Sequence, residues 1–128
     1  MVVGPIAFVG LPGAAHVGKG VLGTRGPRAL PQKILAVVER GHPVTVAIAP
    51  ASRGVAALIY DPSDFDTGRM ALGQADVSTT FHPCGGDQPR TQFNGGLLVI
   101  QPTCIGLDIA WQHRHRTVRV PFAGGRCG

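Results

Sequence analysis

The stretch IGLDIAWQHRHRTVRVPF, residues 105–122, carries the clearest fold signal in the sequence. In residues 105–111 large apolar residues alternate with small or polar ones, which is typical of a strand with one buried face. The basic segment at residues 112–116 has the composition of a solvated turn, and residues 117–122 read as a second strand. This stretch therefore predicts a β-hairpin with a basic tip.

Apolar blocks of similar length recur along the chain, at residues 3–9, 33–39, 44–49, 55–60, 76–81 and 97–101. Clusters of Gly, Pro, Asn and Asp separate them, and strong helix formers are scarce, with a single Glu. Only residues 33–39 would also suit a short helix. Together with the hairpin, the blocks predict one all-β domain over residues 1–128. We expect an antiparallel Ig-like or Greek-key β-sandwich of seven or eight short strands with little helix.

Residues 10–31 are rich in glycine and proline and predict a long irregular loop. Within them, GAAHVGK at residues 13–19 approaches the spacing of a phosphate-binding loop. However, Gly20 occupies the position whose hydroxyl would bind Mg²⁺, and more glycines follow where a helix is required. We therefore expect Lys19 to be solvated and no nucleotide to bind.

The net charge is +5 and the sequence pI is about 9.9. A positive net charge attracts anionic partners, although a basic surface can also serve only to keep the protein in solution. Aromatic residues are too sparse for a base-stacking platform, which disfavours nucleic acid as a partner. No apolar run is long enough to span a bilayer. The first 17 residues lack the basic start of a signal peptide, so we expect any export signal to lie outside this chain.

Three cysteines, Cys84, Cys104 and Cys127, lie beside Gly or Pro at predicted strand ends or in loops. This placement favours a disulfide and therefore an oxidising compartment. If the last four strands form a meander, Cys104 and Cys127 meet at one end while Cys84 lies at the other. The pair Cys104–Cys127 ranks first, and pairing of Cys84 with either partner stays open for a Greek-key strand order.

Histidines offer one alternative function. His113 and His115 flank Arg114 and would chelate a metal from one face of a strand, and His82 would complete the set. These three histidines would then serve a small envelope hydrolase or a metal-dependent enzyme. The arginines beside the histidines disfavour a dication at that place.

Three carboxylates at Asp61, Asp64 and Asp66 would supply oxygen ligands for Ca²⁺. Their spacing is not that of a helix–loop–helix calcium site, and Asp-Pro and Asp-Thr-Gly are ordinary turn sequences. We therefore expect no metal, no cofactor and no catalytic residue.

Four motifs follow one another in the second part of the chain: VSTTFHPC (77–84), TQFNGG (91–96), LLVIQPTCIGLDI (97–109) and VPFAGGRC (120–127). In this order they resemble a pattern in small uncharacterised exported proteins of high-GC Gram-positive bacteria. The resemblance covers residues 33–127, and TQFNGG is its most specific part. Ala123 departs from the pattern, which has Gly directly after Pro-Phe. The resemblance implies export and a β fold.

These observations predict an extracytoplasmic binding or structural module, secreted or held in the cell envelope. Its expected partner is an envelope protein or an anionic surface polymer. The loops at residues 10–31 and 82–94 and the basic tip would make the contact, through Thr91, Gln92, Phe93, Asn94, His113, Arg114, His115 and Arg116. Within TQFNGG we expect a mainly structural role, with Phe93 as an anchor and residues 94–96 at positive φ. A basic nucleic-acid-binding domain is the remaining alternative.

Overall fold

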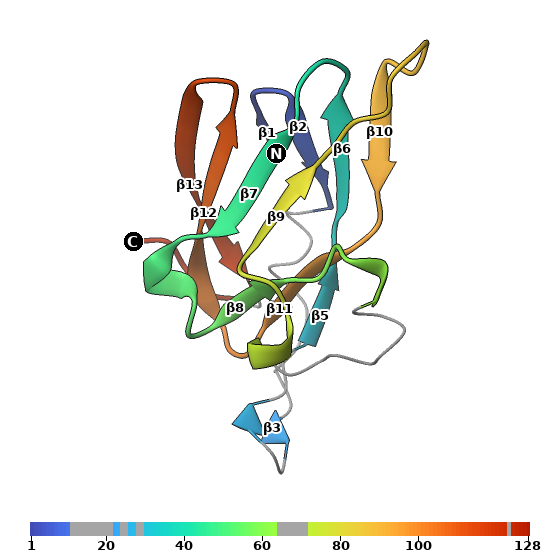
Figure 1. Cartoon of the computed structure of the whole chain (residues 1–128). Helices are drawn as coiled ribbons and strands as arrows, with labels where there is room; N and C mark the ends of the chain where they lie inside the picture. The colour runs from blue at the N-terminus through green and yellow to red at the C-terminus, as the bar shows by residue number, and fades with distance from the viewer. Residues whose placement is uncertain (11–21, 24–25, 28–29, 64–71, 123) are drawn as a thin grey trace.

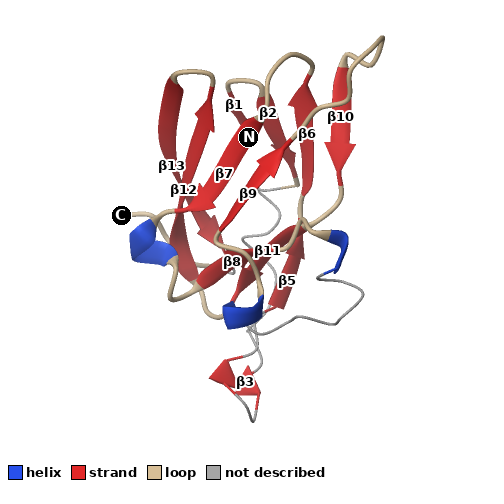
Figure 2. Ribbon diagram, in the orientation of Figure 1, coloured by secondary structure: helices blue, strands red, loops and turns tan. Residues whose placement is uncertain are grey.

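The computed structural model describes residues 1–10, 22–23, 26–27, 30–63, 72–122 and 124–128 (Figure 1). Its strands pair in antiparallel fashion throughout the described part of the chain. Helix there is limited to short segments such as the 3₁₀ turns η2 (Pro50–Ser52) and η3 (Leu72–Gln74) (Figure 2). None of the described helical segments is long and apolar enough to cross a membrane. The predicted all-β antiparallel class is confirmed.

The first third of the chain contributes β1 (Val2–Val3), β2 (Ile6–Val9), β3 (Leu22–Gly23), β4 (Gly26–Pro27), β5 (Leu30–Lys33) and β6 (Leu35–Glu39). The rest contributes β7 (Val44–Ile48), β8 (Ala56–Leu58), β9 (Ser78–Phe81), β10 (Arg90–Phe93), β11 (Gly96–Val99), β12 (Thr103–Trp111) and β13 (Arg114–Phe122). The described strands form three main sheets, ordered β1-β2-β6-β10, β5-β11-β8 and β13-β12-β7-β9, beside the short pair β3-β4. They are thus divided among three sheets rather than the two of the expected Ig-like sandwich.

A continuous strand register explains the additional sheet. Residues 30–39 run antiparallel to residues 90–99, with Phe93 opposite Ala36 and Gly96 opposite Lys33. Between these pairs the Ile34 N–H donates to the Gly95 carbonyl at 2.9 Å. One interrupted two-stranded ribbon therefore passes from the first sheet into the second, so that the same two chain segments contribute to both.

The hairpin predicted at residues 105–122 is present, and β12 and β13 pair over nine residues each. Cys104 lies opposite Pro121, and the chain then turns back so that Cys127 bonds to Cys104, with a Cα–Cα distance of 5.0 Å. The meander used to rank this pair is wrong, because β9 lies beside β7. The pairing follows instead from the β12–β13 hairpin and the turn after it, where the Gly125 N–H donates to the Phe122 carbonyl at 2.8 Å. A disulfide is consistent with an extracytoplasmic protein.

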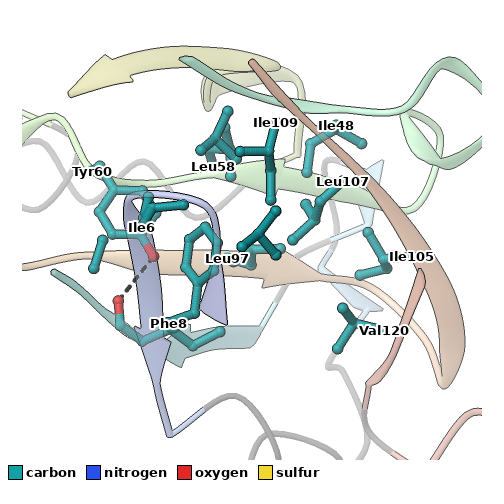
Figure 3. Packing of buried hydrophobic residues seen from close by; sticks show 14 of the residues in the cluster. Ile6, Phe8, Ile48, Leu58, Tyr60, Leu97, Ile105, Leu107, Ile109 and Val120 are labelled. Carbon is teal, nitrogen blue, oxygen red and sulfur yellow. Dashed lines mark hydrogen bonds between the residues drawn. The ribbon is translucent and has the colours of Figure 1, made fainter. Parts of the chain in front are cut away.

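Alternate side chains from the three main sheets meet in one hydrophobic core (Figure 3). Tyr60 donates its phenolic hydrogen to the Ile34 carbonyl at 2.9 Å, the dashed line in Figure 3. Burial raises the pKa of Tyr60. The Phe81 ring contacts the rings of both Tyr60 and Phe93, at centroid distances of 4.9 and 5.0 Å. This aromatic row connects β9 to β10, which belong to different sheets.

Candidate functional site

Three turns between consecutive strands lie at one end of the molecule, at the top of Figure 1. They join β1 to β2 at residues 4–5, β6 to β7 at residues 40–43, and β12 to β13 at residues 112–113. The last two turns adjoin because Val44, at the start of β7, pairs with Trp111, at the end of β12. A depression of about 320 Å³ lies between the three turns, and we call it the hairpin-end depression. Its lining consists of Gly4, Pro5, Glu39, Arg40, His42, Trp111, Gln112 and Arg114.

The indole of Trp111 closes one side of the hairpin-end depression. Gly4 has a φ of 53°, and a Cβ at this position would lie only 2.6 Å from Cε2 of the indole. The ring therefore packs directly on the backbone of the β1–β2 turn, a contact that only glycine allows. Trp111 is half-buried and packs against the core, while its remaining surface lines the depression.

Gln112 has a φ of 50°, the one positive value at a non-glycine residue in the described part of the chain. It is the first residue of the two-residue β12–β13 turn, where a positive φ favours glycine. An L residue in this left-handed conformation costs about 1 kcal/mol or more. Gln112 thus adopts this conformation at a position that lines the hairpin-end depression.

Cationic groups outnumber acidic ones in the lining of the hairpin-end depression. Arg40, Arg114 and His42 line the depression together with one acidic residue, Glu39. Arg40 is held in place, because its Nη1 donates to the Gly86 carbonyl at 2.8 Å. Arg114 is exposed at the start of β13. Guanidinium groups are well suited to binding phosphate and carboxylate oxygens in pairs.

The predicted basic tip is divided between two faces of the hairpin. Side chains alternate along a strand, so Arg114 and Arg116 share one face of β13 and His115 lies on the other. On that other face the His115 Nε2 is 3.9 Å from Oδ1 of Asp108. His113 lies in the turn, and all four tip residues are exposed. Of the four, only Arg114 is in the lining of the hairpin-end depression.

Residues 91–94, expected in a loop, belong mostly to strand β10. The Thr91 hydroxyl accepts a hydrogen bond at 2.7 Å from the backbone N–H of Cys84, which is exposed and outside the disulfide. Phe93 packs against the core, the anchoring role expected from the sequence. Gln92 and Asn94 are exposed. The segment is thus part of a sheet, with only alternate side chains directed outward.

The two glycines of TQFNGG are required mainly by close backbone approach. Of residues 94–96, only Gly95 has a positive φ, 155°. A Cβ at Gly95 would collide with the Ile59 carbonyl, and one at Gly96 would collide with the Gln32 carbonyl. These contacts allow β11 to pair with β5 on one side and β8 on the other. The motif therefore has a structural role in this fold.

The metal candidates that the structure describes do not form a cluster. Among the described residues there is no group of three or more His, Cys, Asp or Glu side chains that could hold a metal ion. His82 is exposed directly after β9. Asp61 is exposed, and its Oδ1 accepts a hydrogen bond from the Ser63 N–H at 3.0 Å, a turn contact. Asp64 and Asp66 lie outside the described residues, and so does Lys19 of the phosphate-loop motif.

Of the eight lining residues, only Arg114 was identified as a site residue from the sequence. The others include Arg40, His42, Trp111 and Gln112. One signal was available, because RGH at 40–42 and QHRHR at 112–116 are both basic turn segments. Their proximity depends on the pairing of β7 with β12, which no local pattern indicates.

Comparisons of this chain with protein-family models, curated proteins and solved structures give no match. Its function is therefore inferred from the geometry of the site.

Proposed function

We propose that this protein is an extracytoplasmic module of the cell envelope that binds an anionic surface polymer at the hairpin-end depression. The observation that carries the proposal is the convergence of Arg40, His42 and Arg114 from two separate turns on one depression, with Glu39 as its one carboxylate. The net charge of +5 supports an anionic partner. The disulfide supports an oxidising compartment.

The lining offers three kinds of contact to such a polymer. Arg40 and Arg114 would each bind a phosphate or carboxylate group through two N–H donors. Gln112 adds a carboxamide that both donates and accepts, and Trp111 adds an indole surface. Arg116 is exposed on the same face of β13 as Arg114 and extends the positive charge along the strand. A chain of repeating anionic groups would therefore engage several arginines at once, which raises its overall affinity.

Calorimetric titration with soluble poly(glycerol phosphate) tests the proposal. We expect Arg114→Ala to weaken binding about tenfold, the effect of losing one charge-assisted contact. We also expect it to reduce the dependence of log Kd on log salt concentration. Arg126→Ala is the matched control, because it removes the same charge from an exposed residue outside the depression. Its affinity should stay within about twofold of wild type.

Two outcomes would contradict the proposal. Equal losses in Arg114→Ala and Arg126→Ala would mean that total charge, rather than the depression, determines binding. Tighter binding to duplex DNA than to poly(glycerol phosphate), with a steep salt dependence, would favour the nucleic-acid-binding alternative instead.

A further inference from the structure

The outer face of the β1-β2-β6-β10 sheet is apolar over β1, β2 and the first part of β6. Its far side is polar, because Gln92 lies opposite Val37 and Arg90 lies opposite Glu39. Val2 lies opposite Ala7 and Ala7 opposite Val37, so one row of aliphatic side chains crosses three strands. Val9 lies opposite Leu35 in a second row. Val2 and Val9 are 74% and 52% exposed, the two highest values for large hydrophobic residues in the described part of the chain. We call the five residues of these two rows the apolar face.

A groove of about 310 Å³ extends over the apolar face, and four of the five residues, all but Leu35, are in its lining. The groove shares Gly4, Pro5 and Glu39 with the hairpin-end depression. Arg90, which pairs with Glu39 across β6 and β10, also lines it. The groove and the depression therefore adjoin at the β1–β2 turn and the end of β6. Aliphatic residues predominate in the groove, and basic residues predominate in the depression.

We propose that the surface with these two hollows docks on an anionic lipid membrane, with the apolar face against the acyl region and the hairpin-end depression against the head groups. The inference rests on the proposed function, because it uses the same cationic depression, and it goes beyond that function by adding anionic lipid head groups as a second ligand of the depression. Charge complementarity supports an anionic membrane as the partner. The groove and the depression are lined by three arginines and one acidic residue: Arg40, Arg90, Arg114 and Glu39.

The apolar face distinguishes a lipid surface from a soluble polyanion. A soluble polyanion would bind the arginines and leave Val2 and Val9 in water. Interfacial binding instead combines buried apolar area with electrostatic attraction to anionic lipid, and each contribution alone is weak. Because the groove adjoins the depression, apolar burial and electrostatic attraction would act together in one orientation of the protein on the membrane.

Vesicles of phosphatidylcholine, with and without phosphatidylglycerol, test the inference. Trp111 is the sole tryptophan of the chain and lines the hairpin-end depression. Its emission should shift to shorter wavelength with phosphatidylglycerol vesicles and stay unchanged with pure phosphatidylcholine. The double variant Val2→Ser/Val9→Ser should weaken vesicle binding about tenfold. Its affinity for soluble poly(glycerol phosphate) should equal that of wild type.

Two further variants keep the test decisive. Val77→Ser is the matched control, because Val77 is 45% exposed and is not in the lining of the groove. It should bind vesicles as wild type does. Val2→Ser alone changes the most exposed of these valines, so the fold is preserved. It should weaken vesicle binding roughly threefold.

Each remaining outcome refutes a defined step. Wild-type vesicle affinity in Val2→Ser/Val9→Ser would overturn the docking inference and leave the proposed function intact. If the wild-type protein binds poly(glycerol phosphate) but not vesicles, the docking inference is overturned and the proposed function is unaffected. Equal binding to both kinds of vesicle would overturn the inference because the charge complementarity would be irrelevant. Absence of wild-type binding to the polymer and to both kinds of vesicle would refute the proposed function as well.

Discussion

Removal of the Cys104–Cys127 disulfide should lower the free energy of unfolding by about 3 kcal/mol. The bond joins residues 23 apart in the sequence. Closing a loop of that length restricts the unfolded chain and thereby stabilises the folded state by about 3 kcal/mol at 25 °C. For a chain of 128 residues, this loss corresponds to a fall of roughly 10–15 °C in Tm.

The assay compares urea unfolding of wild type and Cys104→Ser/Cys127→Ser, followed by circular dichroism. The double variant should also show a larger m value, because its unfolded chain is less compact. Cys84→Ser is the control, since Cys84 is exposed and outside the disulfide, and it should stay within about 0.5 kcal/mol of wild type. A loss below about 1 kcal/mol in the double variant would refute the reasoning, because the bond would then not constrain the unfolded chain.

Three further variants test the site and the core. Gln112→Gly should raise the free energy of unfolding in urea by about 0.5 kcal/mol, because it relieves the positive φ; a less stable variant would contradict this. Gly96→Ala should cost about 3 kcal/mol in thermal melts, since its Cβ collides with a backbone carbonyl of β5, whereas Gly54→Ala, which has open space, should change little. Tyr60→Phe should cost about 1–2 kcal/mol by leaving the Ile34 carbonyl without its donor. Because burial raises the pKa of Tyr60 in the folded state, the unfolded chain loses the phenolic proton first. Wild-type stability should therefore fall as pH rises above about 10, and less steeply in Tyr60→Phe; equal slopes would refute this.

Two kinds of strand could be predicted from the sequence. In one kind the side chains alternate between core and solvent, as at residues 105–109 and 44–48, where every second residue is buried. The other kind is a continuous apolar block that is buried throughout, as in β8 and β11. β10 could not be predicted, because none of its four residues is fully buried and its pairing with β6 stabilises it instead. The division into three sheets depends on the interruption near Ile34 and Gly95, which has no counterpart in hydrophobic periodicity.

The candidate site was predictable only in part, for a related reason. Arg114 could be identified because a basic turn was expected between two strands. Arg40 and His42 could not, because they reach the same depression only through the pairing of β7 with β12. Alternation along β13 also separates His115 from Arg114, so a run of four basic residues does not act as one patch.

Two features at this surface reduce stability or solubility, and each adds a group that a ligand could contact. Gln112 adopts a positive φ where glycine would be more stable. Val2 and Val9 expose apolar surface on β1, at the edge of its sheet, and on its neighbour β2, where polar residues would better protect against association. If the positive charge served only to keep the protein soluble, the strained Gln112 and the exposed valines would not be expected beside a depression lined by arginines. Their occurrence in two adjoining hollows is expected if this part of the surface binds a ligand that is both anionic and apolar.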